Sequence, residues 1–228
     1  MAGRAHFTPA LFAFLRDLRA NNNREWFQKN RARYESVARD PALAFISDLG
    51  PALKRINPRL VADPRPVGGS LFRVNRDIRF AADKSPYKTT VAMSFGTGRD
   101  RHGPEPGYYL SLEPGESFAG GGIHMPDTRT LARIRDALVE DPAGWRRASG
   151  GAFAPRAAPM GEMLKRAPQG YDPGHPLVED LKRKSYIWHQ VFDEKQVCAP
   201  GFLEAYVAAC RAAAPFMRFL GRAVDAPW

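Results

Sequence analysis

Residues 71–95, which read LFRVNRDIRFAADKSPYKTTVAMSF, mark the point where the hydrophobic pattern of this chain changes from helical to extended. Apolar and polar side chains alternate over residues 71–80, and they alternate again over residues 90–95 after a turn. A period of two residues is typical of a β-strand with one buried face. The stretch therefore predicts two strands at the start of a sheet.

Two more extended stretches follow it. Residues 107–113 alternate, and residues 116–125 have the length and composition of a fourth strand. The run Gly120-Gly121-Gly122 inside the latter is expected to form a bulge or bend that lets the backbone pass close to another strand or to a ligand. Short strands that follow one another through turns predict an antiparallel meander.

Before these strands the pattern is helical. Thr8-Pro9 and Asp40-Pro41 are helix start signals, with a capping side chain before a proline at the first helical position. Asn21-Asn22-Asn23 is expected to end one helix and to cap the next, and to place Trp26 in the core. Apolar residues recur at helical spacing as far as Asn57.

Helical patterns return after residue 126. Asp127 is a predicted N-cap, and residues 176–184 predict a short helix. Residues 186–192 alternate weakly and suggest a last strand. A final helix is expected from Pro200 to about residue 224, kinked or split at Pro215.

These patterns predict one α+β domain over residues 1–228. It is expected to be helical over 8–57, mainly β over 70–125 and mainly helical over 127–224. The N- and C-terminal helices should pack on an antiparallel or mixed sheet.

The composition is that of a basic globular protein. The formal net charge is +10, from 34 Lys and Arg against 24 Asp and Glu, which favours acidic partners such as nucleotides or nucleic acid. Residues 1–60 are the most basic part, whereas the triplet 182–184 (Lys-Arg-Lys) is expected to be a solvated surface. Two cysteines make no disulfide framework, and no stretch is apolar enough to span a membrane, so a soluble cytoplasmic protein is expected.

The segment from Arg73 to Lys88 is the most informative for function. It holds five cations and two carboxylates. As a strand, it would place Arg76 on an otherwise apolar face, where a guanidinium needs a carboxylate, a bulge that turns it outward, or a bound anion. Guanidinium groups bind phosphate or carboxylate in bidentate fashion. The predicted ligand-binding residues are Arg73, Asn75, Arg76, Arg79, Lys84 and Lys88.

Catalysis is not settled by these residues. The candidates are Asp77 and Asp83 as a base or metal ligand and Tyr87 as a proton donor. None of the five histidines stands at metal-ligand spacing, so no metal site is expected, and no pattern identifies a cofactor.

The string RVNRDIRFAADKSPYKT closely resembles the signature of a widespread, mostly bacterial family of conserved hypothetical proteins with a domain of unknown function. The resemblance extends to NNNREWFQKNRARYE at residues 21–35, to GYYLSLEPGESFAGGGIHMP at 107–126 and to LKRAPQGYDPGHP at 164–176. It implies no established activity. The characteristic positions that it implies are Arg73, Asn75, Arg76, Asp77, Arg79, Asp83, Lys84, Tyr87 and Lys88.

Three hypotheses remain open at this point. The first is a site for a phosphate- or carboxylate-containing ligand at residues 73–88, with or without chemistry. The second is a non-catalytic nucleic-acid binder that uses the basic N-terminal helices and aromatic neighbours such as Trp26 and Tyr34. The third is a structural or interaction protein whose charged segment is only an internal ion-pair network, for example Arg76 with Asp83, Glu25 or Glu113. The oligomeric state is not predicted.

Overall fold

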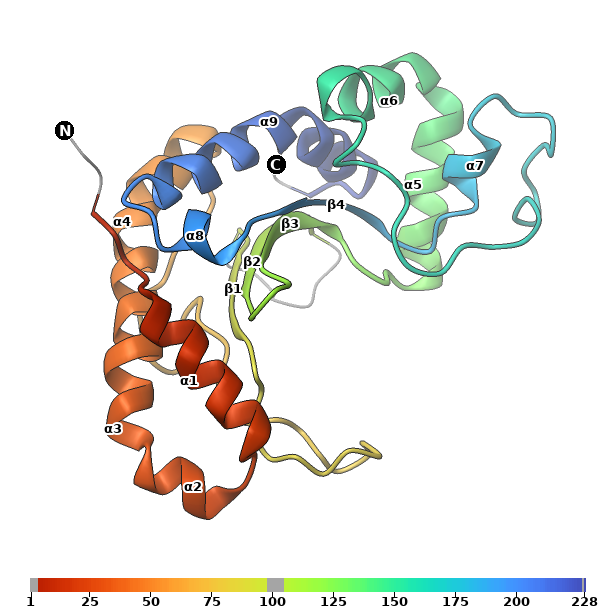
Figure 1. The fold of residues 1–228 in the computed structure, drawn as a ribbon. Coiled ribbons are helices and arrows are strands. Elements are labelled where there is room, and N and C mark those ends of the chain that lie inside the picture. Colours follow the sequence, from red (N-terminus) through yellow and green to blue (C-terminus); the bar gives the residue numbers. More distant parts are fainter. Residues whose placement is uncertain (1–3, 98–104, 227) are drawn as a thin grey trace. The chain divides into compact units, whose positions relative to one another are not determined.

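The computed structural model describes residues 4–97, 105–226 and 228 (Figure 1). It is an α+β protein with a four-stranded antiparallel sheet in strand order β1-β2-β3-β4, as the alternating patterns predict. The strands are β1 (Val91–Phe95), β2 (Gly107–Leu112), β3 (Phe118–Ile123) and β4 (Tyr186–Val191). No helix in the described part of the chain is both long enough and apolar enough to cross a membrane.

The chain falls into two compact units that interleave along the sequence. The first consists of Met1–Phe95, Tyr109–Ala119 and Val191–Ala208, and the second of the remaining residues. The prediction of a single domain over residues 1–228 stays a prediction.

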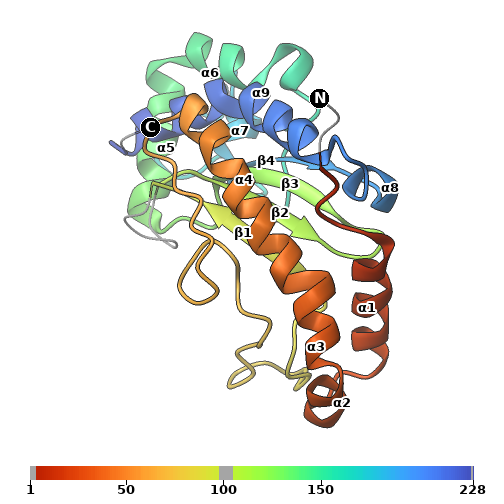
Figure 2. The same cartoon turned by 90° about the vertical axis from the view of Figure 1, so that its left-hand side faces the viewer.

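Helices form the N-terminal part of the first unit. They are α1 (Pro9–Ala20), α2 (Arg24–Lys29), α3 (Arg31–Tyr34), the π-helical segment Glu35–Arg39 and α4 (Asp40–Ile56). Figure 2 shows α3 and α4 following one another as one long rod with α1 beside it. Asp40-Pro41 therefore begins a helix that joins the preceding one without a break.

The start of α1 follows the expected pattern only in part. Pro9 occupies the first helical position, but the Thr8 side chain makes no capping hydrogen bond. Phe12, Phe14 and Leu15 of α1 are buried, and so is Phe45 of α4. Both helices thus contribute to the core. The turn at residues 21–23 directly follows α1.

The second unit contains α5 (Thr128–Glu140), α6 (Pro142–Ser149) and α7 (Val178–Leu181). Helix α9 (Phe202–Ala223) begins in the first unit, after the short helix α8 (Glu194–Val197), and continues into the second. It runs through Pro215 as one element, so of the two predicted effects, a kink or a split, the proline does not produce the split. Asp127 caps α5 by accepting a hydrogen bond from the Thr130 N–H, as predicted.

A buried cation in the second unit corrects the expectation for the basic triplet. Arg183 is only 6% exposed. It donates to the Ala157 carbonyl oxygen at 2.7 Å and pairs with Asp180 at 2.6 Å. Its guanidinium also lies over the Trp145 ring. Arg183 thus links the loop at Ala157 to its own short helical segment, where Asp180 lies three residues before it.

The glycine run in β3 is explained by a close approach of strands. A Cβ atom on Gly122 would lie 2.2 Å from the Tyr186 carbonyl oxygen of β4, and one on Gly121 would lie 2.7 Å from the Gly107 carbonyl oxygen of β2. Of the two expected reasons for these glycines, the neighbouring strand is therefore the one that the structure bears out.

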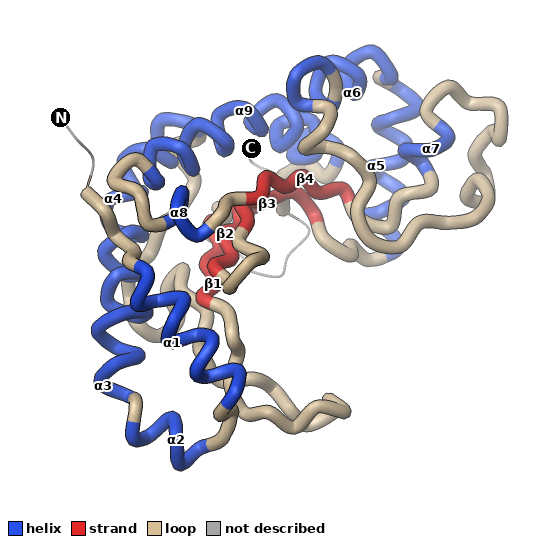
Figure 3. Tube along the Cα trace, viewed as in Figure 1, coloured by secondary structure: helices blue, strands red, loops and turns tan. Residues whose placement is uncertain are grey.

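The largest departure from the expected fold is the segment before β1. Residues 71–90, which we call the arm, form no regular strand; Figure 3 draws them as loop. The arm folds back on itself as a narrow ribbon with an isolated bridge between Asn75 and Tyr87, and a second isolated bridge joins Leu71 to Met93 of β1. The Arg76 N–H donates to the Pro86 carbonyl oxygen at 2.9 Å. These main-chain pairs are isolated and do not extend into a strand, because in the charged turn the carboxylates of Asp77 and Asp83 bond main-chain N–H groups.

Candidate functional site

The expected alternation of side chains along the arm is present. Val74, Arg76 and Ile78 are half-buried, whereas Arg73 and Asp77 between and beside them are exposed. Arg76 thus lies on the less exposed face, as the pattern predicts. Its side chain nevertheless keeps 30% of its surface exposed, so it is not a core residue.

Asp83 supplies the carboxylate that Arg76 requires. The Arg76 Nη1 group donates to Asp83, whose carboxylate also accepts from the Ser85 N–H at 2.8 Å and from the Ser85 hydroxyl at 2.7 Å. These Ser85 hydrogen bonds and the Arg76 guanidinium hold the pKa of Asp83 well below its usual range. Asp83 is therefore an ionised acceptor and a weak base.

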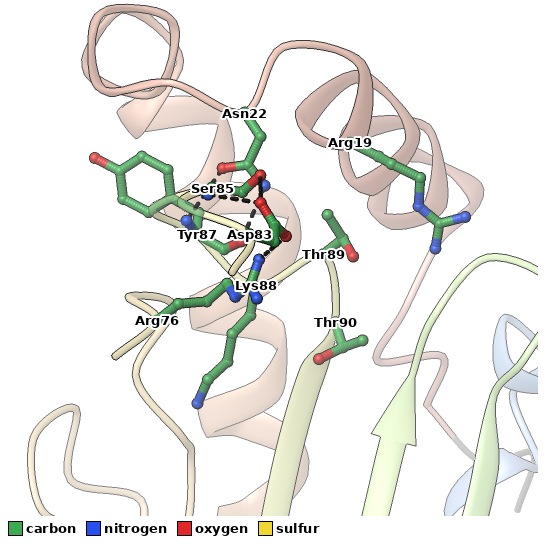
Figure 4. Close-up of a pocket in the computed structure, with 9 residues that line it drawn as sticks. All are labelled: Arg19, Asn22, Arg76, Asp83, Ser85, Tyr87, Lys88, Thr89 and Thr90. Atoms are coloured by element: carbon green, nitrogen blue, oxygen red, sulfur yellow. Dashed lines mark hydrogen bonds and ion pairs between the residues drawn. The ribbon is translucent and has the colours of Figure 1, made fainter. Parts of the chain in front are cut away.

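An open cavity of about 330 Å³ lies at the base of the arm. Residues from the end of α1, the turn after it and the arm line this space, which we call the basic cavity (Figure 4). The lining residues are Arg19, Asn22, Arg76, Asp83, Ser85, Tyr87, Lys88, Thr89 and Thr90. Three cations and one carboxylate give it a formal excess of positive charge.

Two of these cations keep unused donors. Arg19 donates through Nη2 to Glu113 at 2.6 Å, and Arg76 donates through Nη1 to Asp83. Within residues 4–97, 105–226 and 228, the remaining guanidinium N–H groups of both have no hydrogen-bond partner. An arginine carries five N–H donors in a planar fork, so each can also bind an oxyanion.

Lys88 is the third cation, and no carboxylate of the described chain pairs with it. Burial and the nearby Arg73 charge lower the pKa of Lys88. Its ammonium lies 5.3 Å from the centre of the Phe72 ring. In Figure 4 the Lys88 side chain extends away from Asn22. A negative charge in the cavity would offset both unfavourable effects on this ammonium.

The hydroxyl groups of Thr89 and Thr90 also border the cavity. Neither forms a side-chain hydrogen bond with any residue that the structure describes, and both residues are half-buried. Hydroxyl and guanidinium donors around one open space are the groups that bind phosphate or carboxylate oxygens.

Asn22 and Tyr87 have structural roles at this site. The Asn22 amide donates to the Tyr87 carbonyl oxygen at 2.9 Å, and its oxygen accepts from the Tyr87 N–H at 3.1 Å. The Tyr87 ring is 5% exposed and stacks on Phe27 with ring centres 4.0 Å apart. Figure 4 shows the Tyr87 hydroxyl directed away from Arg76 and Asp83, which gives no support to a role as proton donor.

The neighbouring turn behaves as a cap. Asn23 accepts a hydrogen bond from the Trp26 N–H, which confirms the capping interpretation of Asn21-Asn22-Asn23. Phe27 takes the buried position, whereas Trp26 is half-buried and packs on Phe14. Tyr34 packs on the same Phe14 ring. These aromatic residues do not form an exposed stacking surface.

The remaining predicted ligand-binding residues lie outside the lining of the cavity. The Arg79 side chain pairs with Asp77 at 2.6 Å, and the Lys84 ammonium donates to the Ile78 carbonyl oxygen at 3.0 Å. Arg73 and Asn75 are exposed. Of the six predicted residues, the structure brings only Arg76 and Lys88 into the cavity.

Sequence reasoning missed Arg19 and the two threonines. Arg19 stands in an ordinary amphipathic helix, and nothing in its local pattern separates it from other surface arginines. Asn22 belongs to a predicted capping turn and to a segment that resembles the family, but neither signal placed it beside residues 76–90.

Neither Asp77 nor Asp83 has its pKa shifted in the direction that favours a general base. Hydrogen bonds from Arg79 lower the pKa of Asp77, as the Ser85 and Arg76 contacts lower that of Asp83. A general base works best with a pKa near the operating pH. In the described part of the chain no three His, Cys, Asp or Glu side chains gather as metal ligands.

The fold and the cavity together define an α+β protein with a basic cavity at the base of a projecting arm. The chain belongs to the conserved hypothetical protein family DUF2461, whose model matches residues 10–219. No curated protein and no solved structure matches the chain.

Proposed function

We propose that this protein binds a phosphate- or carboxylate-containing ligand in the basic cavity, without chemistry by Asp77 or Asp83. The observation that carries the proposal is Lys88, a half-buried ammonium that has no carboxylate partner among the described residues and lies near Arg73. Arg19 and Arg76 line the same cavity and keep spare N–H groups, although in Figure 4 the Arg19 guanidinium and the Lys88 ammonium point away from each other.

The main alternative is an internal ion-pair network. Arg76 with Asp83, Arg79 with Asp77 and Arg19 with Glu113 are pairs of that kind. Exposed ion pairs contribute little to stability, about 0 to 1 kcal/mol each. They leave Lys88 without a carboxylate partner among the described residues, and they do not explain why the threonine hydroxyls border open space.

A thermal-shift titration separates the two. Inorganic phosphate and a dicarboxylate are added at constant ionic strength, with sodium chloride as the reference. A ligand at ten times its Kd stabilises the folded state by about 1.4 kcal/mol, which raises Tm by about 3 to 6 °C in a protein of this size. The rise should be lost in Lys88→Gln and in Arg19→Ala.

Arg24→Ala is the matched control, because Arg24 is an exposed arginine of the same helical region outside the cavity. It should keep the full ligand-induced rise in Tm. The proposal is overturned if neither anion stabilises the wild type beyond the salt reference while Arg76→Ala merely lowers Tm, which is the result that the ion-pair network predicts.

A further inference from the structure

The tip of the arm carries an aromatic ring with an arginine beside it. Phe80 is 96% exposed, the most exposed large apolar side chain in the described chain. Single exposed apolar residues are common on protein surfaces. Here, however, the Arg79 guanidinium lies over the ring, 5.8 Å from its centre. The Phe80 ring and the Arg79 guanidinium together are the two kinds of group on which nucleobases stack.

Hydrogen bonds hold this tip in shape. The Asp77 carboxylate accepts from Arg79 Nε at 2.9 Å and from the Arg79 N–H at 3.2 Å. The Lys84 ammonium closes the turn by donating to the Ile78 carbonyl oxygen. A preorganised tip loses less conformational entropy on binding than a flexible one.

The charge of the arm fits a polyanion. Five cations and two carboxylates lie between Arg73 and Lys88. Arg73 is exposed and has no carboxylate partner among the described residues. Most cations of the N-terminal helices, in contrast, are paired with carboxylates: Arg16, Arg19, Lys29, Arg31, Arg33 and Arg39. The arm is thus the better candidate for contact with phosphates.

We propose that the arm binds single-stranded nucleic acid, with a backbone phosphate in the basic cavity and a base stacked on Phe80. This inference rests on the proposed function, since the cavity supplies the phosphate site. Arg76 and Phe80 are four residues apart, so their Cα atoms are separated by at most about 14 Å. One short oligonucleotide can therefore reach both groups.

A single strand fits better than the other polyanions. A lone ring needs an exposed base face, and a duplex offers one only after unstacking that costs a few kcal/mol per step. A membrane surface would be expected to meet a broader apolar face, but Phe80 is the one large apolar side chain of the described arm that is exposed. A stable protein interface likewise buries about 800 Å² per partner, far more than one ring.

The test is fluorescence anisotropy with a labelled 12-nucleotide single strand, the same sequence as a duplex, and anionic lipid vesicles. Phe80→Leu, Phe80→Tyr and wild type are compared over a range of salt concentrations. We expect the single strand to bind most tightly, with log Kobs falling by about 0.7 per unit log[salt] for each phosphate contacted. Phe80→Leu should weaken binding about five- to a hundredfold, the value of one base–aromatic stack, whereas Phe80→Tyr should keep it.

Val67→Leu and Val67→Ala are the controls, because Val67 is 87% exposed in the same unit but outside the arm. Both should bind as wild type does. Tighter binding of the duplex or of vesicles than of the single strand overturns the inference, and so does equal binding by Phe80→Leu and wild type.

The phosphate thermal shift distinguishes this inference from the proposed function. If phosphate stabilises the wild type and Phe80→Leu alike but no oligonucleotide binds, the cavity proposal stands and the nucleic-acid inference fails. If neither phosphate nor oligonucleotide acts through Lys88, both fail.

Discussion

The side chain of Asn22 pairs with the main chain of Tyr87 in the way that a neighbouring strand would. Its amide group and its oxygen bond the carbonyl and the N–H of the same residue, at 2.9 Å and 3.1 Å. In the Asn75–Tyr87 bridge the inward hydrogen bonds come from Arg76 and Lys88, so the polar groups of Tyr87 face outward. Asn22 satisfies them, and thereby ties the arm to the turn after α1.

Replacing Asn22 by Ala should therefore loosen the arm. Two hydrogen bonds are lost and the Tyr87 N–H loses its partner, so the free energy of unfolding should fall by about 1 to 3 kcal/mol. Hydrogen exchange at the Tyr87 amide should become faster. Asn21→Ala is the control, since the Asn21 side chain donates to the Asp17 carbonyl oxygen of its own helix and not to Tyr87. Unchanged exchange at Tyr87 in Asn22→Ala would contradict the pairing.

The Tyr87 ring should matter for packing and its hydroxyl should not. Tyr87→Ala removes the stack on Phe27 and should cost about 3 to 5 kcal/mol of stability, measured by denaturant unfolding. Tyr87→Phe keeps the ring and should leave both stability and phosphate binding as in the wild type. A loss of ligand binding in Tyr87→Phe would show that the hydroxyl acts on the ligand after all.

Of the groups around Asp83, the Ser85 hydroxyl should lower its pKa the most. The pKa of the Asp83 carboxyl lies well below its usual range, because the Ser85 hydroxyl, the Arg76 guanidinium and the Ser85 N–H all donate hydrogen bonds to its charged form. Ser85→Ala should raise this pKa toward the ordinary value, and Ser85→Thr should keep it low. Carboxyl-carbon NMR during an acid titration measures it.

The stability that this pairing provides has a definite pH dependence. A carboxyl whose pKa is lower in the folded than in the unfolded chain contributes stability above the unfolded pKa, and the contribution is lost as pH falls through the folded pKa. Acid unfolding of Ser85→Ala should therefore begin at slightly higher pH than that of the wild type. Identical acid transitions would mean that Asp83 is solvated in both.

Gly122 should resist substitution for a steric reason. Its φ angle is +117°, and an added Cβ would meet the Tyr186 carbonyl oxygen at 2.2 Å, so Gly122→Ala should lower the free energy of unfolding by at least about 2 kcal/mol. Gly115→Ala is a matched control, because Gly115 also has a positive φ of +79° but no atom within 4 Å of the added Cβ. It should cost only about 1 kcal/mol. Equal losses in the two variants would remove the steric explanation.

Residues 73–88 illustrate what the local alternation of side chains predicts correctly and what it does not. The alternation placed Arg76 on the less exposed face, and the sequence already offered Asp83 as its partner. The alternation also predicted a full strand at 71–80, which is wrong, because the charged turn around Asp77 and Asp83 bonds its own side chains instead of extending the ladder. Side chains and the neighbouring strand compete for the same main-chain N–H groups. The outcome depends on local geometry, which the spacing of hydrophobic residues does not predict.

The sequence by itself determined the fold class, because hydrophobic period, helix caps and turn residues act over a few positions and are written in neighbouring residues. It also determined the family and the basic character of residues 73–88. Only the tertiary structure decided which cations share a space. Arg19 and Asn22 line the same cavity as Lys88, although more than 60 residues separate them from it in the chain. Arg183 is buried, although it stands between two other cations in the sequence. Which distant residues lie together depends on how the helices and strands pack, and no local sequence pattern predicts it.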